Sequence, residues 1–91
     1  GLLPHEYSLS QNYPNPFNPV TTIQYSLPQR SDVQITIYDL LGKEVITLIS
    51  ETQDAGYKSI QWNASNVPSG MYFYQIKAGT YVQTKKMVLL K

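Results

Sequence analysis

Few residues of this 91-residue chain are of the types that do chemistry, and their positions argue against a catalytic centre. His5 is the only histidine and no cysteine is present, so nucleophilic catalysis lacks an evident base and a thiolate or multi-histidine metal site is excluded. Acid–base catalysis would need two paired carboxylates. The carboxylates fall mostly at expected turns or strand ends: Glu6, Asp32, Asp39, Glu44, Glu51 and Asp54. We therefore expect no enzymatic activity and no cofactor.

Three further patterns resemble binding sites but have ordinary structural explanations. Asn12, Asn15 and Asn18 could offer oxygens to calcium, yet no acidic ligand lies among them, which favours roles in turns. Residues 63–65, Asn-Ala-Ser, match a glycosylation acceptor in a loop that needs such residues anyway. A platform of aromatic rings could stack on a sugar, although packing in a core is favoured. Its candidate members are Tyr13, Phe17, Tyr38, Tyr57, Phe73 and Tyr81.

Length and charge restrict the class of protein further. A chain of this size forms one small domain with a single core and shallow surfaces. No apolar run approaches the ~20 residues that span a bilayer, so no transmembrane segment is expected. The net charge is +1, but Lys85, Lys86 and Lys91 make the last 11 residues basic and leave residues 1–80 with four basic and six acidic side chains. Three dispersed lysines do not predict binding to nucleic acid.

The stretch from Asn12 to Pro28 organises the predicted elements. Pro14, Pro16 and Pro19 fix φ and remove backbone donors, so the preceding residues form a stiff, irregular run. Tyr13 and Phe17 lie in this run, and we expect both rings to dock on a hydrophobic core. From residue 20 onward apolar and polar residues alternate, which predicts a half-buried strand.

The rest of the chain repeats this alternation between turn signals. Strands are expected at 7–11, 20–27, 32–40, 44–49, 57–63, 71–78 and 81–90. Gly42 and Gly56 are expected at turns that need positive φ, residues 78–79 at a tight hairpin turn, and Trp62 at the centre of the core. The inward faces are expected to carry Ile23, Tyr25, Leu27, Val33, Ile35, Ile37, Ile60, Trp62, Tyr72, Tyr74 and Ile76. Residues 7–91 thus predict an all-β, seven-stranded antiparallel immunoglobulin-like β-sandwich, with a small barrel as the alternative and residues 1–6 as a linker.

Several ordered motifs resemble one family. They begin with Asn-Tyr-Pro-Asn-Pro-Phe-Asn-Pro at 12–19 and Thr-Ile-Gln-Tyr-Ser-Leu-Pro at 22–28, and continue with Ile-Tyr-Asp-Leu-Leu-Gly-Lys-Glu-Val at 37–45. Further blocks lie at 56–62 and 69–74, and the chain ends in Lys-Lys-Met-Val-Leu-Leu-Lys at 85–91. Together they resemble the C-terminal sorting domain, type A, of the type IX (Por) secretion system. Asn63 stands where many members carry Asp.

The resemblance implies a sorting signal of Bacteroidetes and related phyla rather than an enzyme. In that family the domain follows a large cargo domain, reaches the periplasm, and is recognised by an outer-membrane translocon and its shuttle protein, after which a sortase-like protease often removes it. The expected partner-binding residues are Lys85, Lys86, Met87, Val88, Leu89, Leu90 and Lys91. The expected structural motif is Tyr13, Pro14, Asn15, Pro16, Phe17, Asn18, Pro19, Gly42, Trp62 and Gly70. We expect the last strand to be an accessible edge.

Two other classes remain open at this stage. One is an immunoglobulin-like structural module similar to the sandwich domain of flagellar hook-capping proteins, which share the hairpin at 37–45 and the strand at 56–62. The proline-asparagine run and the lysine-rich ending separate the two. The other is a carbohydrate-binding accessory module, which would need Tyr38, Tyr57 and Tyr81 in one exposed, coplanar row.

Overall fold

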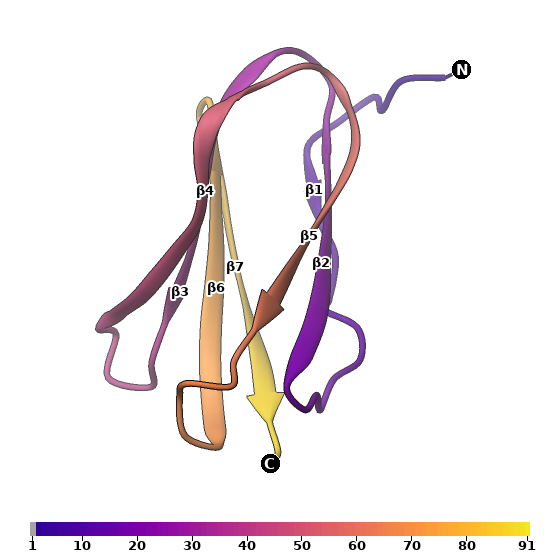
Figure 1. The fold of residues 1–91 in the computed structure, drawn as a ribbon. Coiled ribbons are helices and arrows are strands. Elements are labelled where there is room, and N and C mark those ends of the chain that lie inside the picture. Colours follow the sequence, from indigo (N-terminus) through magenta and orange to yellow (C-terminus); the bar gives the residue numbers. More distant parts are fainter. Residues whose placement is uncertain (1) are drawn as a thin grey trace.

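Two antiparallel β-sheets make up the protein, as seen in a computed structural model that describes residues 2–91 (Figure 1). The three-stranded sheet has the order β1-β2-β5 and the four-stranded sheet the order β4-β3-β6-β7. The strands are β1 (Ser8–Leu9), β2 (Val20–Leu27), β3 (Ser31–Tyr38), β4 (Glu44–Gln53), β5 (Gly56–Asn63), β6 (Gly70–Ala78) and β7 (Tyr81–Leu89). No ladder joins the two sheets within residues 2–91, so they form a sandwich and not a closed barrel. Those residues contain no helix that could cross a membrane.

The core lies between the sheets, and the alternation of the sequence places its side chains correctly. The predicted inward residues of β2, β3 and β6 are all buried. Trp62 is buried as well, but it lies near the end of β5 and packs against Phe17 and Tyr72 rather than at the middle of the core. Ile60 is only partly buried because β5 is an edge strand of its sheet.

Strand β4 is longer than expected. The polar residues after Ile49 continue to pair with β3, through Gln34↔Ser50 and Ser31↔Gln53, and the chain turns only at Asp54 and Ala55. An edge strand needs no apolar residue on its solvent face, so a polar sequence there does not end it.

The stiff proline run, whose three prolyl peptide bonds are cis, buries one of its two aromatic rings. Phe17 is 2% exposed and its ring centroid lies 5.8 Å from that of Trp62. Tyr13 is 69% exposed, so the expectation that it docks on the core is wrong. Its backbone exchanges two 2.9 Å hydrogen bonds with Thr22 and so extends the edge of the three-stranded sheet, with the ring in solvent.

Candidate recognition surface

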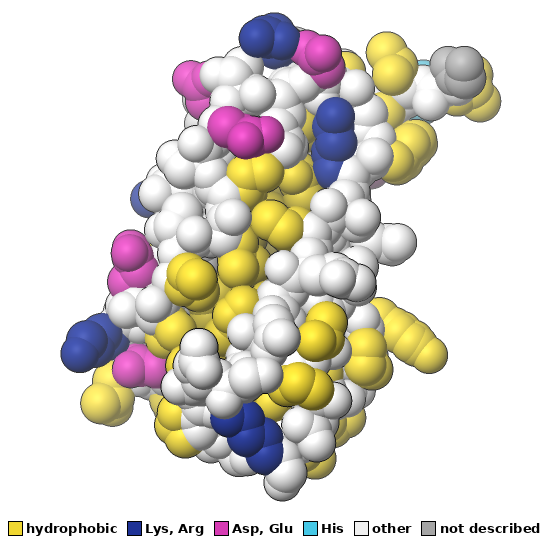
Figure 2. Space-filling model, viewed as in Figure 1, with side chains coloured by type: hydrophobic (Ala, Val, Ile, Leu, Met, Phe, Trp, Pro, Cys, Tyr) yellow, Lys and Arg dark blue, Asp and Glu magenta, His cyan; other side chains and the backbone are white. Residues whose placement is uncertain are grey.

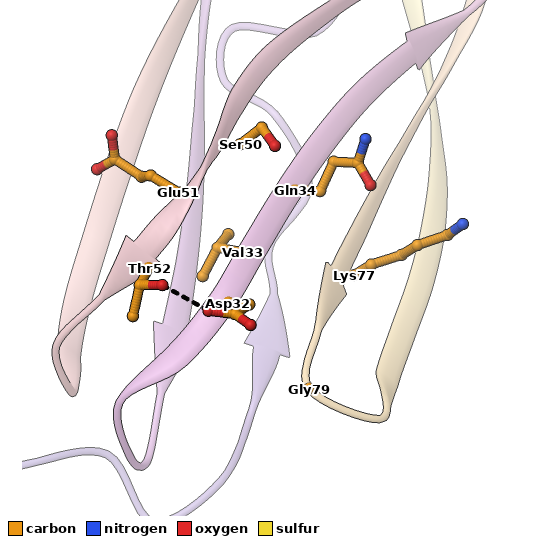
Figure 3. Close-up of a pocket in the computed structure, with 8 residues that line it drawn as sticks. All are labelled: Asp32, Val33, Gln34, Ser50, Glu51, Thr52, Lys77 and Gly79. Carbon is orange, nitrogen blue, oxygen red and sulfur yellow. Dashed lines mark hydrogen bonds between the residues drawn. The ribbon is translucent and has the colours of Figure 1, made fainter.

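A hollow of about 430 Å³ beside β3 and β4 contains the charged side chains of Asp32, Glu51 and Lys77. Figure 3 shows that the Glu51 carboxylate and the Lys77 ammonium point to opposite sides, while Asp32 accepts a hydrogen bond from Thr52. The charged groups therefore do not converge on one point where a substrate could react. Among residues 2–91 no cluster of three His, Cys, Asp or Glu side chains could hold a metal ion.

The aromatic side chains do not form a sugar-binding platform. Tyr57 lies on β5 of the three-stranded sheet, whereas Tyr38 and Tyr81 lie on the four-stranded sheet at opposite ends. Tyr81 is stacked on Tyr7, with ring centroids 5.3 Å apart. The row that a carbohydrate-binding module would need is therefore not present.

The final strand holds both core residues and exposed residues. Met87 and Leu89 are completely buried, whereas Lys86, Leu90 and Lys91 are exposed. Lys85 and Val88 are partly buried. Of the seven residues expected to bind a partner, two therefore belong to the core, and a partner of the folded domain can reach only the side chains of the others.

The backbone edge of β7 is not open along its C-terminal half. The segment 11–17 runs beside it: Phe17 N donates to Val88 O and Leu90 N donates to Phe17 O, both at 3.0 Å. The Gln11 side chain donates to Lys86 O, and the Asn15 side chain accepts from Val88 N. The expectation of an accessible last edge is thus wrong for residues 86–90, because the proline run already occupies the groups that a partner strand would use.

Asn12 holds the same segment in place through hydrogen bonds in the interior of the domain. It is buried, its side chain donates to Pro14 O and to Thr21 Oγ1, and its backbone N donates to the Tyr74 hydroxyl. Asn12 and Asn15 therefore have hydrogen-bonding roles, but the Asn15 side chain bonds to the distant Val88 rather than within a turn.

Residues from four parts of the chain meet at one end of the sandwich, which we call the C-terminal pole: 13–19, 39–43, 64–70 and 88–91. The Lys91 ammonium donates to Ser65 O and Val67 O, and Lys91 N donates to Ser69 Oγ. Gly42, at φ 84°, and Gly70, at φ 149°, both lie here. The N-terminal end of the described chain lies at the opposite end of the molecule (Figure 1).

An aromatic cluster supports the pole from beneath. The Trp62 ring packs edge-on against Tyr72, with centroids 5.5 Å apart, and also contacts Phe17. The Tyr72 hydroxyl donates to Pro68 O at 2.6 Å. Burial, with a smaller contribution from the nearby Asp39 carboxylate, raises the pKa of Tyr72. The hydroxyl thus stays protonated and keeps this bond at physiological pH.

The hairpin between β3 and β4 carries two adjacent exposed leucines of the pole. Leu40 is 62% exposed and Leu41 is 93% exposed; we call this pair the leucine tip. The sequence pattern placed Leu40 at the end of the expected strand 32–40 and Leu41 in the following turn, whereas β3 ends at Tyr38 and both leucines lie in the turn. The order Asp-Leu-Leu-Gly contained the signal, since the two central residues of a turn point away from both strands.

A second apolar feature lies along the side of the sandwich. Figure 2 shows hydrophobic side chains running down the molecule between β4 and β5, where the two sheets do not close over each other. Val45, Leu48, Ile49 and Ile60 are partly buried and pack against the core. The side at β7 is instead closed by the proline run and the Tyr7–Tyr81 stack.

Comparison with protein families supplies an independent finding. A family model described as "Secretion system C-terminal sorting domain" matches residues 11–90, nearly the whole chain. The match begins just before the proline run and ends within the C-terminal pole, so it includes every segment that the fold brings together there. A comparison with curated proteins found no significant match.

Proposed function

Since the chain belongs to the family of secretion system C-terminal sorting domains, we propose that it is read in its folded state by the outer-membrane components of a type IX secretion system. Membership implies a secreted protein that is exported to the cell surface, and the family is one of sorting signals rather than an enzyme class. The proposal adds the partners: a translocon, its shuttle protein and a sortase-like protease, with a cargo domain in the same chain that passes through the periplasm.

The observation that carries this proposal is the joining of the proline run to the final strand. These are the two motifs that separate a sorting domain from other sandwich modules, and they lie side by side through four hydrogen bonds between residues 11–17 and 86–90. A sorting signal that is recognised after folding needs such a fixed arrangement, because the proline run and the final strand are about 70 residues apart in sequence.

The strand order supports an immunoglobulin-like version of the sandwich. The strand orders β1-β2-β5 and β4-β3-β6-β7 are those expected for an immunoglobulin-like sandwich whose fourth strand pairs with the third strand and not with the fifth. We assign residues 7–91 to this domain and residues 1–6 to a linker in which proteolytic release of the cargo would occur. Such a compact, disulfide-free module can fold behind unrelated cargo.

A fusion tests the proposal directly. A signal peptide and a fluorescent passenger are placed before this domain in a host with a type IX system, and surface and medium fluorescence are measured. We expect export in that host and retention in the same host lacking the translocon. Retention in the competent host, or equal export without the translocon, would contradict the proposal.

The role of the terminal lysines needs point variants rather than truncation. Deleting residues 87–91 removes Met87 and Leu89 from the core, so loss of export would follow from unfolding alone. Lys86→Ala keeps the fold because the side chain is exposed. We expect it to reduce export, whereas Lys77→Ala, an exposed lysine on β6 away from the pole, serves as the matched control. Equal export of both variants would remove Lys86 from the recognition surface.

A further inference from the structure

We propose that the outer face of the three-stranded sheet binds a neutral oligosaccharide. Tyr13 and Tyr57 each pack against a sugar ring, and the polar side chains between them exchange hydrogen bonds with the sugar hydroxyls. This site goes beyond the sorting function and does not depend on it, because the final strand belongs to the other sheet.

Two exposed aromatic rings lie on this face. Tyr13 is 69% exposed and Tyr57 is 73% exposed, whereas the other aromatic side chains of residues 2–91 are buried or only partly exposed. Tyr13 pairs with Thr22 on one side of β2, and Tyr57 pairs with Ser26 on the other side. The strand and sheet spacings place the two tyrosines about 16 Å apart on a diagonal across the face.

An uncharged polar floor lies between the two rings. Thr22 and Gln24 on β2 are paired with Gln61 and Ser59 on β5, and paired residues point to the same side of a sheet. Gln24, Ser59 and Gln61 are exposed, and Thr22 is partly exposed. Hydroxyl and amide groups can both donate and accept hydrogen bonds, which suits them to the hydroxyl groups of a sugar.

The outer face of the four-stranded sheet differs in both respects. Gln75 donates a 3.0 Å hydrogen bond to Thr84 there, so the two side chains bond to each other. Lys77 and Lys86 add positive charge to that face. The neutral floor with polar groups open to solvent is therefore a property of the three-stranded sheet.

Two hollows on this face share Gln24. One, of about 530 Å³, is lined by Tyr13 and Thr22 as well, and the other, of about 360 Å³, is lined mainly by serines and by Tyr57. Lys58 is the only charged residue in these two linings, and it alternates with Tyr57 to the inner side of β5. Each hollow thus has one aromatic ring for the apolar face of a sugar and polar groups for its hydroxyls.

The chemistry of this face selects the kind of ligand. A phosphate or another ionic ligand needs a charged partner, which the floor lacks. A protein interface needs an apolar centre, whereas the centre here is Gln24 and Ser59 and the rings lie at the periphery. A second copy would bring the same polar centre to the contact. Unlike a row of coplanar rings, which suits a flat polysaccharide surface, two separated rings hold a single sugar chain at two points.

Calorimetric titration of the purified chain with short oligosaccharides tests the inference. The neutral probes are oligomers of glucose, mannose, galactose, xylose and N-acetylglucosamine, and an oligomer of galacturonic acid is the charged probe. We expect at least one neutral probe to bind. Tyr13→Ala and Tyr57→Ala should each weaken that binding by about tenfold or more, whereas Tyr57→Phe keeps the ring and most of the affinity.

A matched pair of glutamine variants locates the binding on this face. Gln24→Ala removes the amide shared by the two hollows, and Gln34→Ala makes the same change at an exposed glutamine of β3 in the other sheet. We expect weaker binding for Gln24→Ala and unchanged binding for Gln34→Ala. Thermal melting checks that all variants fold.

Three outcomes would overturn the inference. They are binding of no neutral probe, binding of the charged probe alone, and equal affinity of Tyr57→Ala and Tyr57→Phe. Equal affinities of Gln24→Ala and Gln34→Ala would likewise place the sugar elsewhere on the molecule. Export of the fluorescent fusion is a separate measurement, so the absence of sugar binding leaves the sorting function standing.

Discussion

Tyr74 joins the four-stranded sheet to the N-terminal segment through one hydroxyl group. The group donates to Ser10 O at 2.7 Å and accepts from Asn12 N at 2.8 Å, inside the core. Tyr74→Phe leaves both backbone groups without a partner, and we expect the free energy of unfolding to fall by about 1–3 kcal/mol. Urea denaturation at pH 7 measures this, with the exposed Tyr57→Phe as control. A change no larger than that of the control would contradict the assigned role.

Tyr74 also makes the stability of the fold depend on pH in the alkaline range. Burial raises the pKa of Tyr74 to about 12, with a smaller opposing effect of the hydrogen bond from Asn12. The unfolded tyrosine titrates near pH 10, so the unfolded state releases its proton first as the pH rises. We expect full stability below about pH 10 and a loss of about 1.4 kcal/mol per pH unit from there to about pH 12. Unfolding curves at these pH values should show a shallower loss for Tyr74→Phe.

Gly42 allows a test of backbone strain without side-chain contacts. Its φ is 84°, and a Cβ atom there would meet no atom within 4 Å. We expect Gly42→Ala to lower the unfolding free energy by about 1–2 kcal/mol through strain alone. Gly42→Asn should lower it less, because asparagine tolerates positive φ. Equal destabilisation by the two variants would show that another property of glycine is needed.

At the scale of elements, the proline run covers the edge of β7 through an isolated bridge between Phe17 and Leu89 and the side chains of Gln11 and Asn15. Its attachment depends on one buried ring, since Phe17 is enclosed by the aromatic cluster whereas Tyr13 lies in solvent. Phe17→Ala is expected to destabilise by about 3–5 kcal/mol and Tyr13→Ala by less than about 1 kcal/mol. Calorimetric melting of the two variants distinguishes them. Comparable losses would mean that the run is held by its backbone bonds rather than by the ring.

The strands and the proline run differ in how well the sequence predicts which side chains are buried. Alternation correctly predicted the inward faces of β2, β3 and β6, because the face of a strand is a local property. Alternation predicted that β4 ends at residue 49, which is too early, because polar residues on an edge strand do not mark the end of that strand. It treated Tyr13 and Phe17 alike, because no periodicity in an irregular run tells which ring points inward.

At the scale of the molecule, the two ends of the sandwich differ. The C-terminal pole gathers the leucine tip, Gly70 and Lys91, while the described N-terminal residues lie at the opposite end. A passenger joined before residue 1 leaves the pole uncovered, whereas a passenger joined after Lys91 lies against it. We therefore expect export of the first fusion and retention of the second, measured by surface fluorescence. Equal export would show that recognition does not need a free pole.

The sequence by itself determined the class of fold, most strand positions, the inward faces and the resemblance to sorting domains, because each depends on residue types at short spacing. Only the tertiary structure decided which strand edges are occupied and which distant residues meet at the pole. The physical reason is that edges pair through backbone groups that nearly every residue carries alike. A pattern of side chains therefore shows which way a strand faces, but the packing of the whole chain selects its neighbour.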